Sequence, residues 1–503
     1  MSMPESAGIP AFDAASILDR LRTLREADAP THGGHVLSYV YDSGSAALDE
    51  LAAEAIRIMQ PVNGLDPTAF PSVAAMEREL VGFAREVFAA DAEGREEIAG
   101  TVTTGGTESC LLAVKAARDS WRGDGAPRLL APSTVHAAFH KAAEYFGLAL
   151  DLVPVEPDGS LRADRLIERL GDDVALVVVS APSYPFAALD PVAEVAAACA
   201  GRGIACHVDA CIGGWVLPWW GGEVPAWDFR VPGVTSLSAD LHKFGYAPKG
   251  ASVLLHRGRD RQRAQYFATT SWPGYPVVNP TMLGSRSAGP LAAAWSIIQA
   301  LGADGLADLA RSCRRATDAL IELVGSIEGL RVVGSPTGPL FAVAADDARL
   351  PERQVDPHHW ADQVRVHGWL LQLQPGFVQA DGTRLPHTTH LTVTPVTERV
   401  LPELGAALVR AAEEVRGVPA VDPEQVLRSL PPELSAGVLG SEGAAQLDSA
   451  TAWQLLNAIG LAPGSDGTAL PERMAPFLAL VEALPHPLTE RLLTELLARL
   501  VEP

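Results

Sequence analysis

The chain has 503 residues, of which 48% are hydrophobic and 20% charged, a balance typical of soluble globular proteins with two or three domains. Its formal net charge of −22 argues against nucleic acid and anionic membrane surfaces as partners, because both favour an excess of Lys and Arg. The five cysteines show no paired metal-ligand spacing, so we expect reduced thiols and no metal. With no apolar run of ~18 residues and no signal-peptide pattern at Met1 to Pro10, we expect a cytoplasmic protein without a membrane anchor.

The N-terminal part predicts helices joined by loops. Apolar residues recur at helical spacing over residues 13–26, and a Gly-, Pro- and His-rich loop follows to about Tyr41. Residues 46–60 and 72–90 are predicted as amphipathic helices. The irregular segment 61–71 lies between them, and such a long loop between good helices is often functional.

From about residue 98 to 260 the chain alternates between short apolar runs and Ala-rich helical stretches. Continuous apolar strands interleaved with helices predict a mostly parallel sheet that is covered on both faces. Residues 110–121 are one predicted helix of this region, and residues 287–327 form a long helical connection after it. The predicted strands are 128–131, 149–153, 174–179, 203–208, 233–238 and 252–256.

After residue 330 the pattern predicts a smaller α+β unit. Its strands are expected at 330–333, 340–344, 369–373 and 390–394, around two helices. The segment 420–503 is rich in Leu, Ala and Pro and is predicted to be helical, with a role in packing or oligomerisation. We therefore divide the chain into an N-terminal segment 1–70, a large domain 71–325, a small domain 326–416 and a helical extension 417–503.

Two charged residues follow neighbouring predicted strands. Asp209 follows the strand 203–208, and Lys243 follows the strand 233–238, so both are expected at strand ends, where open α/β sheets bind ligands. Pyridoxal 5′-phosphate (PLP) needs such a pair, since an amine forms a Schiff base with its aldehyde and a carboxylate pairs with its pyridinium nitrogen. The pair therefore indicates a PLP site.

A Gly-rich turn and a histidine complete the pattern. The turn Thr103–Ser109 precedes a helix, where free N–H groups favour phosphate; alone it is a weak signal, but beside Asp209 and Lys243 it indicates a clamp for the cofactor phosphate. His136 begins another helix and could stack on the pyridine ring or simply cap the helix. His140 is four residues on, but no acidic partner follows the zinc pattern.

Three further residues near these motifs are candidates. His242 could reach the cofactor phosphate while Lys243 reaches the aldehyde. Lys249 could hold a substrate anion or transfer protons, and the alternative is an exposed surface lysine. The polar turn Gly284–Gly289 could present Ser285 to a phosphate across a dimer interface, and the alternative is a plain loop.

Together these motifs resemble the sphingosine-1-phosphate lyase branch of the fold-type-I PLP enzymes, relatives of the group II decarboxylases, over about residues 36–416. The resemblance implies an α/β fold-type-I transferase fold, with a large domain around a mostly parallel sheet and a smaller α+β domain. It also implies a homodimer with the active site at the subunit boundary. The matching blocks are Thr104–Ser109, His136–Gly147, His207–Gly214, Ser238–Gly250 and Gly284–Ser287.

Carried over position by position, the resemblance implies a role for each matching residue. Lys243 corresponds to the Schiff-base lysine, Asp209 to the pyridinium partner and His136 to the residue that stacks on the ring. The remaining cofactor contacts are expected from Gly106, Thr107, Ser180, His242 and, from the second subunit, Ser285. The positions that contact the substrate's phosphate in the lyases are occupied by Tyr41, Asn63 and Lys249.

Two departures from the family pattern concern the substrate. The family's Asn-Pro-Leu-His-Pro is here Asn63-Gly-Leu-Asp-Pro67, so Asp66 replaces a histidine that helps to bind phosphate. A carboxylate about 4 Å from a phosphate costs on the order of 1–4 kcal/mol. The usual Pro-His-Gly is changed to Pro185-Phe-Ala187. An amine, a hydroxyl or another polar group is the alternative to a substrate phosphate.

These observations lead to one main hypothesis and two alternatives. We expect a PLP-dependent carbon–carbon lyase that cleaves the Cα–Cβ bond of a β-hydroxy amine and releases an aldehyde. An amino acid decarboxylase would use the same cofactor apparatus, and Asp66 would suit recognition of a distal amine in its substrate. A non-catalytic scaffold is disfavoured by the intact set of Lys243, Asp209 and His136. In the first two cases the ligand is a small-molecule amine or amino acid.

Overall fold

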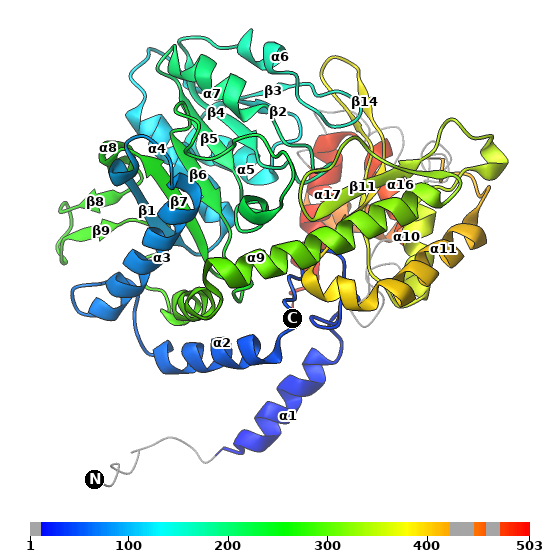
Figure 1. Ribbon diagram of the computed structural model, residues 1–503, viewed down its shortest axis with the longest axis horizontal. Helices are drawn as coiled ribbons and strands as arrows, with labels where there is room; N and C mark the ends of the chain where they lie inside the picture. Colours follow the sequence, from blue (N-terminus) through cyan, green and yellow to red (C-terminus); the bar gives the residue numbers. More distant parts are fainter. Residues whose placement is uncertain (1–11, 423–446, 459–472, 503) are drawn as a thin grey trace.

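A computed structural model describes residues 12–422, 447–458 and 473–502 (Figure 1). The N-terminus that we searched for a signal peptide, and the parts 423–446 and 459–472 of the predicted helical tail, lie outside the described residues. Among the described helices, none has both the length and the apolar character that a membrane crossing requires.

A seven-stranded sheet forms the centre of the large α/β part. Strand β7 runs antiparallel to both of its neighbours, β1 and β6, and the other described pairs of this sheet are parallel. Every residue of the central strand β4 is buried, as expected for a parallel strand covered on both faces. In spatial order the strands are β1 (Ile98–Thr103), β7 (Ser252–Arg257), β6 (Ser236–Ala239), β5 (Ala205–Asp209), β4 (Val174–Ser180), β2 (Arg128–Pro132) and β3 (Ala149–Val153).

Helices cover both faces of this sheet (Figure 1). Alternate residues of β2 show the two faces: Leu129 and Ala131 pack in the core that includes α4 and α5, whereas Leu130 packs in the core that includes α3, α7 and α9. The helices α2 to α9 are α2 (Ala46–Met59), α3 (Pro71–Ala89), α4 (Gly106–Ser120), α5 (Ala137–Phe146), α6 (Ala163–Ile167), α7 (Val192–Ala200), α8 (Arg259–Ala264) and α9 (Gly289–Ser326).

A four-stranded antiparallel sheet forms the core of the smaller α+β part, together with α10 (Pro357–Val366) and α11 (Leu401–Val415). The long helix α9 connects the two parts and is interrupted at Gly302, where φ is 56°. The strands of this sheet, in spatial order, are β10 (Leu330–Val332), β11 (Leu340–Ala345), β15 (Thr388–Thr392) and β12 (Gln372–Gln374).

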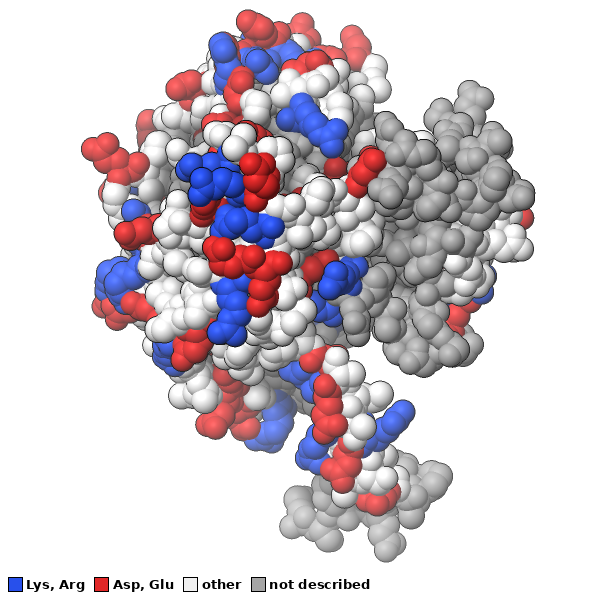
Figure 2. Space-filling model, turned by 90° about the vertical axis from the view of Figure 1, so that its right-hand side faces the viewer, with Lys and Arg blue, Asp and Glu red and all other residues white. Residues whose placement is uncertain are grey.

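Two short hairpins, an N-terminal helix and three C-terminal helices complete the described chain. Helix α1 (Ala14–Arg25) projects from the body in both overall views (Figures 1 and 2). The hairpins are β8 (Phe267–Thr269) with β9 (Val277–Asn279), and β13 (Phe377–Val378) with β14 (Arg384–Leu385). The C-terminal helices are α15 (Ser449–Ala458), α16 (Ala475–Ala483) and α17 (His486–Arg499).

The predicted α/β class with a mostly parallel sheet is confirmed, but several boundaries differ. Helix α4 begins at Gly106, four residues before the predicted start, because the Gly-rich turn forms its first turn. Strand β6 begins at Ser236 rather than residue 233. In the smaller sheet, β12 begins later in the chain than the predicted strand 369–373. Strand β15 begins earlier than the predicted strand 390–394.

Candidate active site

The candidate residues gather at the carboxyl ends of three adjacent parallel strands. Asp209 ends β5, and it pairs in register with Ser180 at the end of β4 and with Ser238 in β6. Lys243 follows β6 by four residues. The sheet therefore brings together residues that lie up to 63 positions apart in sequence, at the edge where parallel sheets bind ligands.

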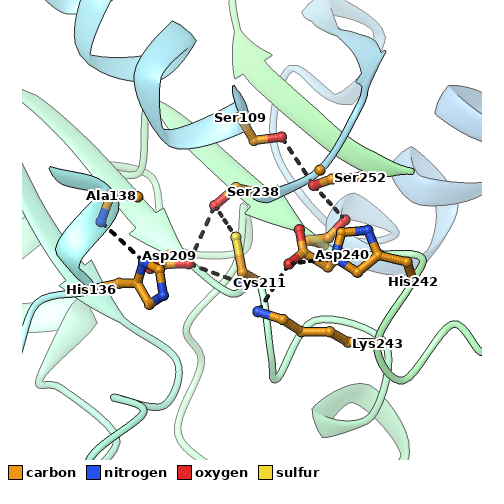
Figure 3. Close-up of polar contacts among 12 residues, drawn as sticks. Ser109, His136, Ala138, Asp209, Cys211, Ser238, Asp240, His242, Lys243 and Ser252 are labelled. Carbon is orange, nitrogen blue, oxygen red and sulfur yellow. Dashed lines mark hydrogen bonds and ion pairs between the residues drawn. The ribbon is translucent and has the colours of Figure 1, made fainter. Parts of the chain in front are cut away.

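Lys243 lies at the wall of a cavity of about 520 Å³ that is also lined by Tyr41 and His136. Its Nζ is 2.9 Å from Oδ2 of Asp240, a carboxylate that is only 1% exposed (Figure 3). Burial lowers the pKa of Lys243, but the Asp240 carboxylate beside it raises it, and the pKa ends well above its ordinary value. The Asp240 carboxylate thus favours the charged form of the free amine.

Asp209 has one carboxylate oxygen engaged and one available. Its Oδ1 accepts hydrogen bonds from the Cys211 N–H at 3.0 Å and from the Ser238 hydroxyl at 3.5 Å (Figure 3). Neither bond uses Oδ2. Because these two donors fix the carboxylate, Oδ2 is held in one orientation, suited to accept a hydrogen bond from a protonated ring nitrogen.

His136 is the N-cap of α5 and lies beside Asp209 (Figure 3). Its Nδ1 accepts a hydrogen bond from the Ala138 N–H at 3.1 Å. Burial lowers the pKa of His136, against the opposing effect of Asp209. The imidazole is therefore neutral near pH 7, with its proton on Nε2, and it is both a helix cap and a flat ring at the cavity.

The start of α4 forms a cradle that only glycine permits. Gly105 has a φ of 149°, and a Cβ there would lie 3.1 Å from Cε1 of His242. A Cβ on Gly106 would lie 2.5 Å from Oδ2 of the buried Asp240. Thr107 is exposed in the first turn of the helix. Free N–H groups, a hydroxyl and an imidazole thus converge where an anion binds well.

The fit to PLP can be judged from these residues. An amine, a carboxylate with a free oxygen, a flat ring and an anion cradle surround one end of the sheet, and these are the groups that the cofactor's aldehyde, ring nitrogen, ring face and phosphate require. In addition, Oδ1 of Asp240 is buried without a hydrogen-bond partner among the described residues. The residues present fit the cofactor.

Lys249 lies next to this centre. Its Nζ donates a hydrogen bond to the backbone oxygen of His242 at 3.1 Å and lies 4.5 Å from the ring centroid of Tyr41. Burial and the nearby charge of Lys243 lower the pKa of Lys249 to about 8. Lys249 is exposed, as the alternative of a surface lysine expects, but its amine is held against His242 and Tyr41 and can exchange a proton near neutral pH.

Three predicted residues lie elsewhere on the chain. Asn63 Nδ2 donates to the Ser285 hydroxyl at 3.3 Å, so these two residues lie together. Asp66 lines a second cavity, of about 980 Å³, and its Oδ1 accepts hydrogen bonds from the backbone and hydroxyl of Thr68. Neither cavity lining contains both Asp66 and Lys243. One chain alone does not bring Asn63, Asp66 and Ser285 to the Lys243 cavity.

Sequence reasoning missed several residues at the site. Asp240 stands three residues before Lys243, and this spacing could have predicted their ion pair. Asp190 is fully buried, and its Oδ2 accepts a hydrogen bond from the Ser180 N–H at 2.7 Å. The outer cavity wall comes from the distant β12 and β13–β14 segments, which gave no signal; its residues include Gln372, Gln374, Phe377 and Leu385.

Two family descriptions match the chain. "Pyridoxal-dependent decarboxylase conserved domain" matches residues 31–336, and "Pyridoxal-dependent enzyme, C-terminal putative HTH domain" matches residues 415–499. Among curated proteins, the chain is 34% identical over 384 residues to sphingosine-1-phosphate lyase of Dictyostelium discoideum, covering 75% of this chain and 68% of that protein. It is 32% identical over 415 residues to the Arabidopsis thaliana enzyme, covering 80% and 73%. The chain thus spans about two thirds of the length of these relatives.

Solved structures agree with the sequence matches. The sphingosine-1-phosphate lyase of Burkholderia pseudomallei superposes with a TM-score of 0.72 at 31% identity, covering 83% of this chain and 93% of that one. Glutamate decarboxylase of Lactobacillus brevis superposes with a TM-score of 0.71 at 19% identity, covering 84% and 97%. The second match concerns the fold alone.

Proposed function

The chain belongs to the pyridoxal-dependent decarboxylase family, in the branch of the sphingosine-1-phosphate lyases, and we propose that it cleaves the Cα–Cβ bond of a β-hydroxy amine to release an aldehyde. It is a PLP-dependent lyase. The observation that carries the proposal is the cluster of Lys243, Asp240, Asp209 and His136 at one end of the sheet.

The cofactor supplies an electron sink that stabilises the negative charge left on the substrate carbon when a bond breaks. In the proposal, Lys243 provides the amine that holds the cofactor aldehyde, and Asp240 controls the proton of that amine. Asp209 would keep a proton on the ring nitrogen through Oδ2. His136 would offer its flat ring to the cofactor.

Phosphate binding falls to the cradle in front of α4. Gly106 and Thr107 offer backbone N–H groups at the helix N-terminus, and His242 offers its imidazole. Ser180 lies at the neighbouring strand end, where Asp190 holds its backbone. Together with Asp209, these residues would hold the cofactor at this end of the sheet.

Two lysines are proposed to move protons. Lys249 has a pKa of about 8, so a fraction of its amine is neutral at physiological pH and can accept the proton of the β-hydroxyl. Lys243 would return a proton to the substrate carbon. Tyr41 lies under the Lys249 ammonium and keeps it in place.

We further propose a cytoplasmic homodimer in which the second subunit completes the site. Asn63, Asp66 and Ser285 would then serve the neighbouring subunit's cavity. The support is that Asn63 and Ser285 lie together at 3.3 Å, away from the Lys243 cavity of their own chain. Asp66, in place of the family histidine, argues for a polar group other than a phosphate in the substrate.

Decarboxylation is the second candidate, because the matching family includes decarboxylases. The test incubates PLP-loaded protein with β-hydroxy amines, phosphorylated and not, and with amino acids, and measures aldehyde and carbon dioxide. We expect aldehyde from a β-hydroxy amine and no product from the Lys243→Ala variant. Carbon dioxide from an amino acid, without aldehyde from any β-hydroxy amine, would overturn the proposal in favour of decarboxylation.

A further inference from the structure

The C-terminal helices lie against the outer wall of the Lys243 cavity. Helices α15 and α17 share a small leucine core, which includes Leu455 and Leu492, and α16 packs against α10 and β12. Glu482 of α16 pairs with Arg384 of β14 (Figure 1 shows both elements). The cavity wall is built from the same β12 and β13–β14 segments.

Two carboxylates fix α16 at its two ends. Asp362 of α10 accepts hydrogen bonds from the Met474 N–H at 2.8 Å and the Ala475 N–H at 2.9 Å, and thereby caps the start of the helix. At the other end, Glu482 accepts a hydrogen bond from the Gly376 N–H at 2.8 Å. It also pairs with Arg384 at 3.3 Å. The helix is therefore held at both ends.

A negative charge at Glu482 would be unfavourable without these hydrogen bonds and the ion pair. It stands in the last turn of α16, where the helix dipole disfavours negative charge. Its side chain is only 9% exposed, and a buried carboxylate is costly unless it is hydrogen-bonded. A Cβ on Gly376 would lie 3.0 Å from Oε2 of Glu482. The absence of a side chain at Gly376 therefore leaves room for the Glu482 carboxylate.

Gly376 stands between two residues that line the cavity. Pro375 and Phe377 both belong to its wall, and Phe377 pairs across the hairpin with Leu385, which also lines it. The Phe377 ring lies 5.9 Å, between centroids, from the ring of His486 at the start of α17. Glu482 and His486 thus hold the apolar side of the wall from outside.

We propose that Glu482 is a positioning residue for the substrate pocket, and that through it the C-terminal helices set the space for an apolar group of the amine substrate. This inference rests on the proposed function for the identity of the reacting group. It assigns no contact between Glu482 and the substrate itself, because Glu482 acts through Gly376 and the hairpin.

The charges of α17 favour this role over binding to nucleic acid. Arg491 and Arg499 both pair with Glu495, at 3.1 Å and 2.9 Å. Recognition of a nucleic acid backbone needs cations that are free to meet phosphates. These two arginines are instead engaged within the C-terminal helices.

The test compares Glu482→Ala and Glu482→Gln with the control Glu502→Gln, a surface residue of the same C-terminal segment. Amide hydrogen exchange is measured over residues 375–386 of the PLP-loaded protein, and kcat and KM are measured for β-hydroxy amines with short and long apolar chains. In Glu482→Ala we expect hairpin exchange to rise about tenfold or more, as when a hydrogen bond to a charged group is lost. We expect KM for long chains to change at least about fivefold, with kcat within about twofold.

Glu482→Gln keeps an acceptor for the Gly376 N–H, so it should restore most of the protection and of the KM. Unchanged hairpin exchange in Glu482→Ala would overturn the inference, and so would a fall in kcat at constant KM. If Glu482→Ala does not fold, Asp362→Asn loosens the other end of α16 and is expected to show the same pattern.

A separate measurement distinguishes failure of the inference from failure of the proposed function. The PLP-loaded wild type and the variants are titrated with dodecylamine and ethylamine by calorimetry. We expect Glu482→Ala to change the affinity for dodecylamine and leave that for ethylamine unaltered, even if no β-hydroxy amine is cleaved. Equal effects on both amines, or none, would overturn the role of Glu482 while leaving the lyase proposal intact.

Discussion

Two buried carboxylates near Lys243 differ in what they contact. Asp240 is paired directly with the amine. Asp209 is held by the Cys211 N–H and the Ser238 hydroxyl, and it keeps one oxygen for another partner. One carboxylate can therefore set the charge of the lysine, and the other that of the cofactor ring. This division of work predicts distinct effects when each is changed.

Replacing Asp209 with asparagine should impair chemistry more than cofactor binding. Without the carboxylate the ring nitrogen loses its proton and the electron sink weakens, so we expect kcat to fall by roughly a hundredfold or more. The phosphate cradle is untouched, so the Kd for PLP should rise less than about tenfold. Steady-state kinetics and cofactor titration measure the two quantities, and an unchanged kcat would contradict the role.

Asp190 should make stability depend on pH. Burial raises the pKa of Asp190 from 3.8 to about 7. Between these values the unfolded chain releases a proton that the folded chain keeps, so stability falls as pH rises from about 4 to 7. The effect is at most a few kcal/mol, since one pKa unit corresponds to about 1.4 kcal/mol.

The Asp190→Asn variant tests this dependence. Its amide oxygen can still accept the hydrogen bond of the Ser180 N–H, but the group cannot ionise. We expect the melting temperature of the wild type to fall between pH 5 and pH 8, and that of the variant to fall less. Parallel curves for the two proteins would show that Asp190 does not titrate in this range.

At the scale of single residues, sequence patterns identified the groups that end strands. Asp209 and Lys243 could be predicted because each follows an apolar run, and the sheet register pairs Asp209 with Ser238 of the strand that Lys243 follows. Asp190 gave no such signal, because its approach to Ser180 depends on the fold of the loop after β4. The part that Asn63 and Ser285 play in the site would depend on the proposed second subunit, which a single chain does not specify.

Among the elements, the first turn of α4 has two positions that favour glycine. Gly105 has a backbone conformation that side chains rarely adopt, and Gly106 leaves no room for a Cβ beside Asp240. The helix begins where the cofactor phosphate is proposed to bind. A change in this turn should therefore disturb both the phosphate cradle and the lysine's partner.

Gly106→Ala should weaken cofactor binding. The added Cβ displaces the Asp240 carboxylate, and we expect the Kd for PLP to rise on the order of tenfold or more, equivalent to about 1.4 kcal/mol. The matched control is Gly325→Ala in α9, where an added Cβ meets nothing within 4 Å and helix propensity favours alanine by about 1 kcal/mol. Equal Kd values for both variants, from fluorescence titration, would refute the cradle.

Helix α1 should contribute to the proposed dimer. None of its residues is buried in the single chain, and Leu21 and Leu24 are 60% and 55% exposed. An apolar stripe of this kind is stable when another surface covers it. The double variant Leu21→Glu and Leu24→Glu should shift the protein toward monomer in sedimentation, whereas Arg20→Glu on the same helix should not. A dimer of unaltered affinity would exclude α1 from the interface.

The strands of the molecule differ in how well the sequence predicts them. The buried parallel strands were predictable because both faces are apolar, as in β4, where every residue is buried. The hairpins β8–β9 and β13–β14 have strands of two or three residues, too short for a periodic pattern. Since β13–β14 forms part of the cavity wall, an element that the sequence did not predict bears on the proposed substrate choice.

At the scale of the whole molecule, charge and fold point to a small-molecule enzyme. On the face shown in Figure 2, acidic and basic side chains alternate and do not gather into a basic patch. The net charge of −22 agrees with this pattern. The division into segments 1–70, 71–325, 326–416 and 417–503 stays a prediction, and the inferred role of Glu482 would make the last segment part of the active-site architecture.

The most direct test of the account is to identify the lysine that holds the cofactor. PLP-loaded protein is reduced with borohydride, digested and mapped by mass spectrometry. The account predicts a phosphopyridoxyl group on the peptide that contains Lys243, and none in the Lys243→Ala variant. A label on Lys249 or on any other residue, or no label at all, would contradict it.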